Sequence, residues 1–395
     1  MNNIAYVKDV LQSIRNQIKD YHKNELNVGV LSGLSGISIF LFHYSEFLQD
    51  EEIAHEATEL IEISIEKLNG TYRLPTFCSG ISGFAWALDY LYKYDFLDIE
   101  VEEYLLQLDT YLYKIMLQDF KQGRYDYMHN ALGYAFYFLK RYHNTEIKHL
   151  KDQYEQILSE VILNLDEISV NIQNNYAIWV SDVMGQDKPV VNFGLAHGLP
   201  SILSFFNKLT QVEKFKDTAK DKIRNLSDFI LKNKLKFDNK MGSTFPSYLY
   251  GTDYKNATES RLAWCYGDLG IASVIWNSGK ILNNELLKSE AIEIFKHSSE
   301  RNTFETTEVK DMYFCHGSFG IVHMYRNIYK DTGIIEFKDT SEFWIKEGLK
   351  MYEKNITENQ GPELSILEGL AGVGLVLLSC LKNERMAWDE CLLLL

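Results

Sequence analysis

Apolar and amphipathic segments alternate along this chain. Residues 36–43 and 372–380 are apolar nearly all round, as expected for helices that are packed on every side. Residues 101–120 are amphipathic, and so are residues 52–68. At helical spacing, one face of residues 52–68 carries Ile53, Ala57, Leu60, Ile61, Ser64 and Leu68. Each period of the pattern therefore predicts one amphipathic helix followed by one buried helix.

A short glycine-rich turn opens each buried segment. It is clear at Gly33-Leu-Ser-Gly36 and at Gly267-Asp-Leu-Gly270, and degenerate where the chain has Asn130 or Ser201 in place of a glycine. The first positions of the seven copies are 33, 80, 130, 198, 267, 317 and 369. A repeat of this length is typical of stacked helical units. Glycine at these turns allows the loop backbone and neighbouring helices to approach closely.

The repeat predicts the fold class. Seven helix pairs can stack as an open solenoid or close into a ring. Apolar helices that alternate with amphipathic ones favour two concentric layers, so we predict an all-α fold, an α/α toroid (barrel) of seven inner and seven outer helices. We expect one domain over residues 1–395, with the first outer helix at about Ile4 to Tyr21. All seven turns should then lie at one end of the ring, around one cavity.

Two of the periods are longer than the others. They contain insertions at about residues 170–192 and 237–261, which are rich in Tyr, Val, Gly and Ser. We expect these insertions to form short strands or loops near the mouth of the cavity.

Composition narrows the function. A net charge of -15 argues against a nucleic-acid partner, which requires a basic face. The longest apolar run, Leu370 to Leu381, is too short to span a bilayer, and the first residues contain no apolar signal core. The five cysteines show no disulfide spacing, which favours a reducing compartment. We therefore expect a cytoplasmic protein without a transmembrane segment.

The residues just before the turns carry the candidate chemistry. Two positions before, the repeats have Leu31, Cys78, Met128, Ala196, Cys265, Cys315 and Leu367. One position before, they have Ser32, Ser79, His129, His197, Tyr266, His316 and Glu368. Cys265, Cys315 and His316 come from adjacent repeats, so we expect them to be neighbours. Two thiolates and one imidazole leave a fourth position open, as in a catalytic zinc site; the alternative is that both cysteines are small core residues.

Other polar residues near the turns are further candidates. His197 precedes Cys265 by one repeat and could act as an acid or base. Asp126 could function there or cap its turn, and His129 competes with it. Arg261 could stabilise an anion or pair with a structural acid. We expect the remaining cysteines, Cys78, Cys380 and Cys391, to be packing residues.

Three stretches resemble the lanthionine synthetase C-like family, the cyclases of lantibiotic biosynthesis. They are Gly194-Leu-Ala-His-Gly198, Arg261-Leu-Ala-Trp-Cys-Tyr-Gly267 and Cys315-His-Gly317. The end of the chain, Trp388-Asp-Glu-Cys-Leu-Leu-Leu-Leu395, is also similar, and the resemblance covers essentially the whole chain. The third repeat departs from the family pattern, with Met128-His-Asn-Ala in place of a glycine-rich turn.

The resemblance implies an α/α toroid with a small insertion near the cavity. It also implies one Zn²⁺ per chain, with Cys265, Cys315 and His316 as its ligands. Functional roles are implied for His197, Asp126, Arg261 and Tyr266.

The implied activity is that of a lanthionine synthetase. Such an enzyme adds cysteine thiols to dehydroalanine or dehydrobutyrine of a precursor peptide (leader plus core) and forms (methyl)lanthionine thioether rings. We expect the stand-alone cyclase type, which works after a separate dehydratase. The resemblance also suggests a dehydratase and an export transporter as partners, and a place at the membrane periphery through that complex.

Three alternatives remain at this point. A non-cyclising relative that binds zinc and glutathione would share every motif. An α/α-toroid glycosidase would need paired carboxylates, and the turns offer Asp126, Asp268 and Glu368 without an evident pair. A metal-stabilised scaffold would need no catalysis.

Overall fold

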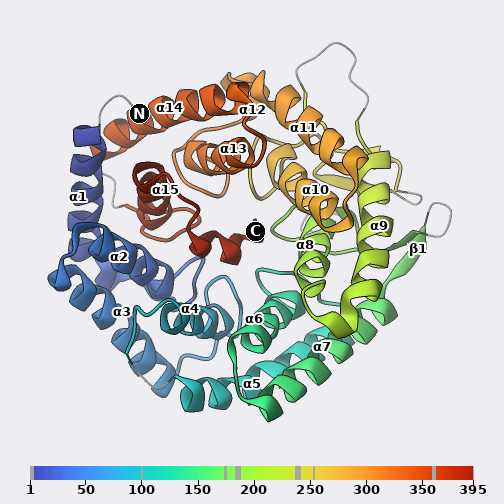
Figure 1. Ribbon diagram of the computed structural model, residues 1–395, viewed down its shortest axis with the longest axis horizontal. Coiled ribbons are helices and arrows are strands. Elements are labelled where there is room, and N and C mark those ends of the chain that lie inside the picture. The colour runs from blue at the N-terminus through green and yellow to red at the C-terminus, as the bar shows by residue number, and fades with distance from the viewer. Residues whose placement is uncertain are drawn as a thin grey trace. The chain divides into compact units, whose positions relative to one another are not determined.

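The computed structural model describes residues 4–98, 101–172, 176–182, 188–235, 242–251, 254–357 and 362–394. The chain divides into two compact units. Unit 1 is Met1–Leu165 with Asn355–Trp388, and unit 2 is Asp166–Lys354 with Asp389–Leu395. Both units repeat the predicted pair of one amphipathic helix and one buried helix (Figure 1).

Unit 1 contains two layers of helices. The buried layer consists of α15 (Leu370–Lys382), α2 (Leu34–Leu48), α4 (Ile81–Lys93) and α6 (Ala131–Asn144), in that spatial order. The amphipathic helices are α1 (Ile4–Tyr21), α3 (Glu51–Asn69), α5 (Glu102–Lys121) and α7 (Lys148–Ile168), and the short 3-10 helix η1 (His22–Asn24) follows α1. α3 packs on α2, α5 packs on α4 and α6, and α1 packs on α15. The first amphipathic helix has the predicted bounds.

Unit 2 has the same organisation. Its buried helices are α8 (Leu199–Leu209), α10 (Asp268–Leu282) and α13 (Ser318–Thr332), with α10 between the other two. Its amphipathic helices are α9 (Lys216–Lys232), α11 (Glu285–Ser299) and α14 (Ile335–Thr357). Short elements complete it: η2 (Glu213–Phe215), α12 (Phe304–Thr307) and the end of η3 (Ala387–Leu392). α12 was not predicted.

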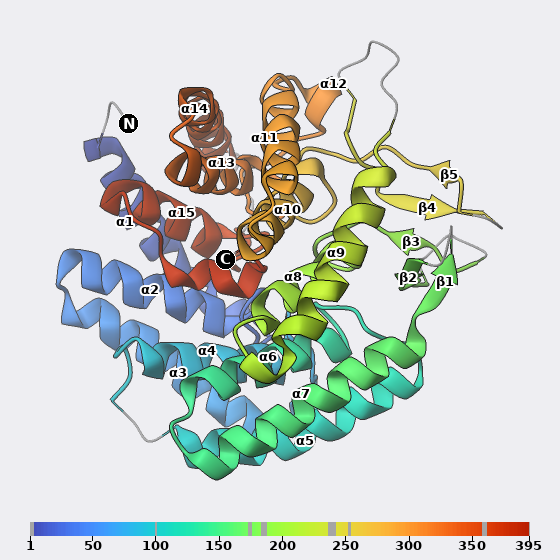
Figure 2. The ribbon, with the colours of Figure 1, turned by 45° about the vertical axis from the view of Figure 1, so that its right-hand side comes forward.

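The two insertions contain short strands, as predicted. β1 (Val170–Ile172) pairs antiparallel with β2 (Tyr176–Ile178). β3 (Val191–Asn192), β4 (Tyr248–Tyr250) and β5 (Asn256–Ala257) form a second antiparallel sheet in that order. The strand β2 contacts α9. Figure 2 shows both sheets beside this helix. Residues 173–175, 183–187, 236–241 and 252–253 of these insertions lie outside the described part of the chain.

The glycine-rich turns have the predicted structural purpose. Each of the seven buried helices begins one residue after the first position of a turn. A Cβ atom at Gly320 would lie 2.0 Å from the carbonyl oxygen of Phe314, and one at Gly270 would lie 2.3 Å from that of Trp264. Because these neighbours are backbone atoms of the same loop, only glycine allows the loop to fold this closely onto its helix.

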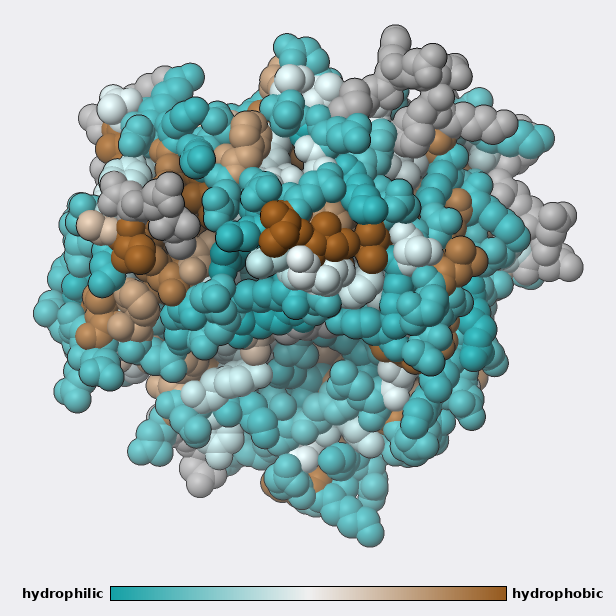
Figure 3. Space-filling view, turned by 45° about the horizontal axis from the view of Figure 1, so that its top comes forward, coloured by the Kyte–Doolittle hydropathy of each residue, from teal (hydrophilic) through white to brown (hydrophobic). Residues whose placement is uncertain are grey.

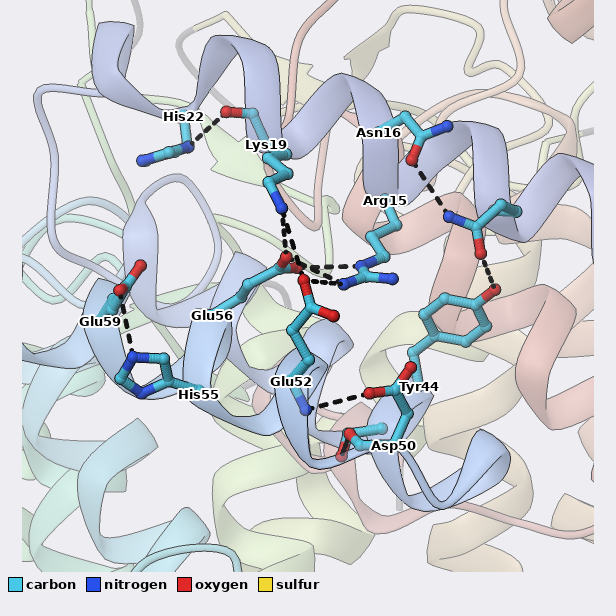
Figure 4. A network of polar contacts seen from close by, with 12 residues as sticks. Arg15, Asn16, Lys19, His22, Tyr44, Asp50, Glu52, His55, Glu56 and Glu59 are labelled. Atoms are coloured by element: carbon cyan, nitrogen blue, oxygen red, sulfur yellow. Dashed lines mark hydrogen bonds and ion pairs between the residues drawn. The ribbon is translucent and has the colours of Figure 1, made fainter.

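The amphipathic prediction for residues 52–68 is confirmed in α3. The six residues predicted to share a face are its buried residues. Asp50 caps the helix by accepting the N–H of Glu52 at 3.0 Å. Beside this face, Glu56 pairs with Arg15 at 2.9 Å and with Lys19 at 3.0 Å, which ties α3 to α1 (Figure 4).

The face of the molecule drawn in Figure 3 is largely polar. On the face drawn in Figure 3, hydrophobic residues form small groups separated by hydrophilic ones. Large exposed apolar side chains such as Leu286, Phe304 and Ile335 belong to different helices. None of the helices in the described ranges combines the length and the apolar character needed to cross a bilayer.

Candidate metal centre

Backbone hydrogen bonds join equivalent positions of successive turns. In unit 2, the N–H of Cys265 donates to the carbonyl oxygen of Cys315 at 3.3 Å. In unit 1, Leu31 donates in the same way to Cys78 at 3.0 Å, and Cys78 donates to Met128 at 2.9 Å. Residues with the same place in the repeat are therefore neighbours in space, which is why two cysteines fifty residues apart meet.

The predicted zinc ligands converge. One ligand atom each from Cys265, Cys315 and His316 lies within 4.8 Å of the others. Donors around a tetrahedral zinc with Zn–S bonds of about 2.3 Å are separated by about 3.8 Å, so the cluster has the size that this ion requires. Both cysteines are buried, while His316 is 28% exposed. Two thiolates and one imidazole fit zinc and leave a fourth position for another ligand.

The electrostatics of the cluster favour a thiolate. The pKa of Cys265 lies well below its usual range because the Cys315 thiol, and then His316, hydrogen-bond to its sulfur and outweigh burial. The pKa of His316 is raised, mainly by its hydrogen bond with Cys265 and also by the charge of Asp311, while burial and the Arg261 cation oppose the rise. The thiolate is the form of cysteine that binds metals.

Asp311 orients the histidine of the cluster and was missed in the sequence. Its Oδ2 atom lies 3.4 Å from Nε2 of His316. Its Oδ1 atom accepts the N–H of Tyr313 at 2.8 Å, which fixes the carboxylate in the loop. Carboxylates in this position commonly hold metal-binding histidines. The only sequence signal is an acidic residue four positions before Cys315.

His197 and Tyr266 lie next to each other. Their rings stack with centroids 5.7 Å apart. Asn192, at the end of β3, donates its side-chain N–H to the phenol oxygen of Tyr266 at 3.1 Å. Tyr248 packs edge-on against the same ring, with centroids 5.3 Å apart. The second small sheet therefore positions Tyr266, and sequence reasoning identified neither Asn192 nor Tyr248.

The loop that carries Cys265 is closed at both ends. Arg261 pairs with Gly267 through a backbone bridge, and the Arg261 cation acts on His316. Behind the loop, Asp268 is completely buried and binds Arg301 at 2.8 Å. Asp268 is thus a structural carboxylate, and the part considered for it in a glycosidase is not supported.

Asp126 and Cys78 belong to unit 1. The carboxylate of Asp126 accepts the N–H of His129 at 2.9 Å, which is the turn-capping arrangement weighed for it. Its role in chemistry stays a prediction. Cys78 is buried, as expected for a packing residue, and burial raises the pKa of its thiol to about 12. Cys380 and Cys391 are buried as well.

Comparisons with known proteins agree with these observations. The family model described as lanthionine synthetase C-like protein matches residues 24–393. Among solved structures, nisin cyclase is similar with a TM-score of 0.78 and 19% identity, over 98% of this chain and 97% of the other. This likeness shows a common fold, and the predicted all-α, α/α-toroid class is confirmed.

Two sugar epimerases are more distant. Cellobiose 2-epimerase from Bacillus thermoamylovorans matches with a TM-score of 0.44 and 12% identity, over 76% of this chain and 86% of that one. A sugar epimerase from a ruminal bacterium matches with a TM-score of 0.43 and 10% identity, over 95% and 99%. TM-scores below 0.5 are too low to support an argument about fold or function.

Proposed function

Because the chain belongs to the lanthionine synthetase C-like family, we propose that it is a zinc-dependent peptide cyclase. Its reaction adds a cysteine thiol to dehydroalanine or dehydrobutyrine within one precursor peptide and forms a thioether ring. The observation that carries this proposal is the convergence of Cys265, Cys315 and His316 at one point. A core made of packing cysteines would not require a histidine and an orienting carboxylate beside them.

The three ligands would hold one Zn²⁺. When bound, this ion favours loss of the proton from a substrate thiol at neutral pH, where free cysteine with a pKa of about 8.5 is mostly protonated. Asp311 keeps the ring of His316 in place.

Two further tasks of the reaction are to transfer a proton and to stabilise a negative charge. A C–S bond forms at the β-carbon, the π bond between Cα and Cβ is lost, and the proton released from the thiol is balanced by one gained at Cα. Addition places negative charge on the adjacent carbonyl as an enolate. His197 is positioned by its stacking on Tyr266, and we assign to its imidazole the proton transfer at Cα. Arg261 and Tyr266 stabilise the enolate or shape the pocket, and Asp126 balances the charge of a histidine.

The proposed substrate is a dehydrated precursor peptide with leader and core. A dehydration reaction must supply it, because this cyclisation consumes dehydro residues and cannot make them. We also propose a dehydratase and an exporter as its partners, in the cytoplasm close to the membrane.

A cyclisation assay tests the proposal. The probe is a synthetic peptide with one dehydroalanine and one cysteine, and the readout is loss of alkylation by N-ethylmaleimide, because cyclisation leaves the mass unchanged. Wild-type protein should bind one Zn²⁺ and close the ring, whereas Cys315→Ala should lose both properties. Cys78→Ala is the matched control, since this buried thiol has the same place in its turn; it should keep both.

Two results would contradict the proposal. Full cyclisation by zinc-free Cys315→Ala would exclude the mechanism. A wild-type protein that binds zinc and glutathione but never closes the ring would instead support the non-cyclising alternative.

A further inference from the structure

The C-terminal residues of unit 2 are buried and hydrogen-bonded to side chains far away in the sequence. Successive carbonyl oxygens accept from three different elements. Leu392 accepts from Nε1 of Trp264 at 2.8 Å, and Leu393 accepts from the hydroxyl of Ser204 at 2.9 Å. The next carbonyl, that of residue 394, accepts from the Asn277 side chain at 3.2 Å. We call Asp389–Leu394 the C-terminal segment.

The first of these hydrogen bonds, at Leu392, involves Trp264, the residue before the candidate zinc ligand Cys265. Trp264 directly precedes Cys265 and is completely buried. Its backbone N–H donates to the carbonyl of Cys315 at 3.2 Å, and its indole N–H donates to Leu392. The C-terminal segment therefore holds the side chain of Trp264, while the backbone of the same residue is bonded to the second cysteine turn.

A second path leads to the other cysteine. Phe314 directly precedes Cys315 and packs on the ring of Trp264, with centroids 6.4 Å apart. Phe314 also contacts the ring of His323 on α13 at 5.5 Å. Nε2 of His323 lies 2.7 Å from Oδ2 of Asp389, and both side chains are buried. The C-terminal segment thus supports both residues that precede the two cysteines.

The backbone of this segment is unusual. Leu393 has a φ of 61°, in the left-handed region that leucine rarely adopts. This bend separates the directions of neighbouring carbonyl groups, so that Leu392 reaches Trp264 while Leu393 reaches Ser204. An uncommon conformation that persists in a buried segment points to a specific requirement for it.

We propose that the C-terminal segment is a positioning element for the candidate zinc centre. It holds Trp264 and Phe314, and through them sets the separation of Cys265 and Cys315. The inference rests on the proposed zinc site and extends it to residues that do not touch the metal. Partners outside the ligand set commonly change metal affinity by about 10–100-fold when they are lost.

A pair of matched variants tests this. Trp264→Phe keeps an aromatic ring against Phe314 but removes the donor to Leu392. Ser204→Ala removes the neighbouring bond to Leu393, which has no link to a cysteine in the contacts described above. Zinc affinity is measured by competition with a chelator, at a temperature where circular dichroism shows all proteins folded. Trp264→Phe should bind zinc about 10-fold more weakly or worse, and Ser204→Ala should bind like wild type.

The second path has its own test with a conservative rescue. Asp389→Ala removes the acceptor of His323, whereas Asp389→Asn keeps an oxygen there. Zinc affinity should fall in Asp389→Ala and largely return in Asp389→Asn. In the Co²⁺-loaded proteins, the thiolate charge-transfer and d–d absorption bands should shift in Trp264→Phe and Asp389→Ala only, because ligand separation is what changes.

The outcomes separate this inference from the proposed function. If wild-type protein binds neither Zn²⁺ nor Co²⁺ through thiolates, the metal site itself is wrong, and the inference falls with it. If wild type binds both ions while Trp264→Phe and Asp389→Ala keep its affinity and spectrum, the inference alone is overturned. Equal weakening in Trp264→Phe and Ser204→Ala would also overturn it, since a general loss of packing would then explain the effect.

Discussion

Removing the buried carboxylate of Asp268 should destabilise unit 2 strongly. This side chain accepts the N–H groups of Thr244 and Phe245 at 2.8 and 2.9 Å, and it binds Arg301 at 2.8 Å. Arg301 also donates to the carbonyl of Ser260 at 3.2 Å. The pair therefore joins three segments: the second insertion, the start of α10, and the loop after α11 that carries Arg301.

The magnitude follows from what Asp268→Ala leaves behind. Neither partner of the pair is more than 2% exposed, and a buried charge that loses its partner costs about 3–5 kcal/mol. Each of the two N–H groups left without an acceptor costs about 1–3 kcal/mol more. These costs overlap when the loop relaxes, so we expect a loss of at least about 4 kcal/mol. That is a large part of the roughly 5–15 kcal/mol by which folded proteins are stable.

A double-mutant cycle with Asp268→Ala and Arg301→Met makes the prediction specific. The double variant contains no unpaired buried charge, so it should be less destabilised than the sum of the two single variants by at least about 2 kcal/mol. The assay is urea unfolding followed by circular dichroism. Glu293→Ala is the control, because its pair with Lys296 is exposed and should contribute under about 1 kcal/mol. A loss clearly below about 4 kcal/mol in Asp268→Ala, or strict additivity in the cycle, would refute this reasoning.

Three further predictions concern the turns, the proton transfer and pH. Gly320→Ala should weaken zinc binding by about 10-fold or more in a chelator competition, because its Cβ would lie 2.0 Å from the Phe314 carbonyl and displace Cys315. His197→Asn should keep zinc, cyclise about 10²–10⁴-fold more slowly and give a mixture of Cα stereoisomers, measured by chiral chromatography. The side chains of His43 and Lys382 lower the pKa of Glu46 to about 2. Ionised Glu46 therefore stabilises the fold at pH values above its unfolded pKa of about 4.3. The difference in thermal midpoint between wild type and Glu46→Gln should shrink as pH falls from 5 towards 2.

Each of these three predictions would be contradicted by a specific result. Gly70→Ala is the control for the turn, because its Cβ would have only ordinary contacts; equal zinc affinity in Gly320→Ala and Gly70→Ala would show that the turn adapts. Wild-type rate and stereochemistry in His197→Asn would move the proton transfer to another residue. A Glu46→Gln difference that stays constant with pH would mean that the charge of Glu46 does not stabilise the fold.

Local sequence predicted the helices well because their signals are local. The apolar face of α3 and the glycine at each turn depend on helical periodicity and on backbone clearance, which few residues determine. The repeat also predicted that Cys265 and Cys315 are neighbours, and the backbone bond between them confirms it. The strands of the insertions were predicted only as short strands or loops, since two- and three-residue strands carry almost no periodic signal.

The residues around the site were harder to predict from the sequence. Asn192 and Asp311 are ordinary polar loop residues in the sequence, and only folding brings them to Tyr266 and His316. Asp268 was considered as a possible catalytic acid because it lies in one of the turns. Its burial against Arg301, thirty-three residues later, shows a structural role.

The repeat, the alternation of helix types and the choice of Cys265, Cys315 and His316 can be read from the sequence, because they depend on residue type and spacing. The contacts that hold these three residues in place become visible only in the folded structure. The second small sheet fixes Tyr266, the Asp268–Arg301 pair fixes the start of α10, and the C-terminal segment supports the cysteine turns. Such contacts join residues that are distant in the chain, so no local pattern specifies them; they exist only once the packed helices bring the loops together.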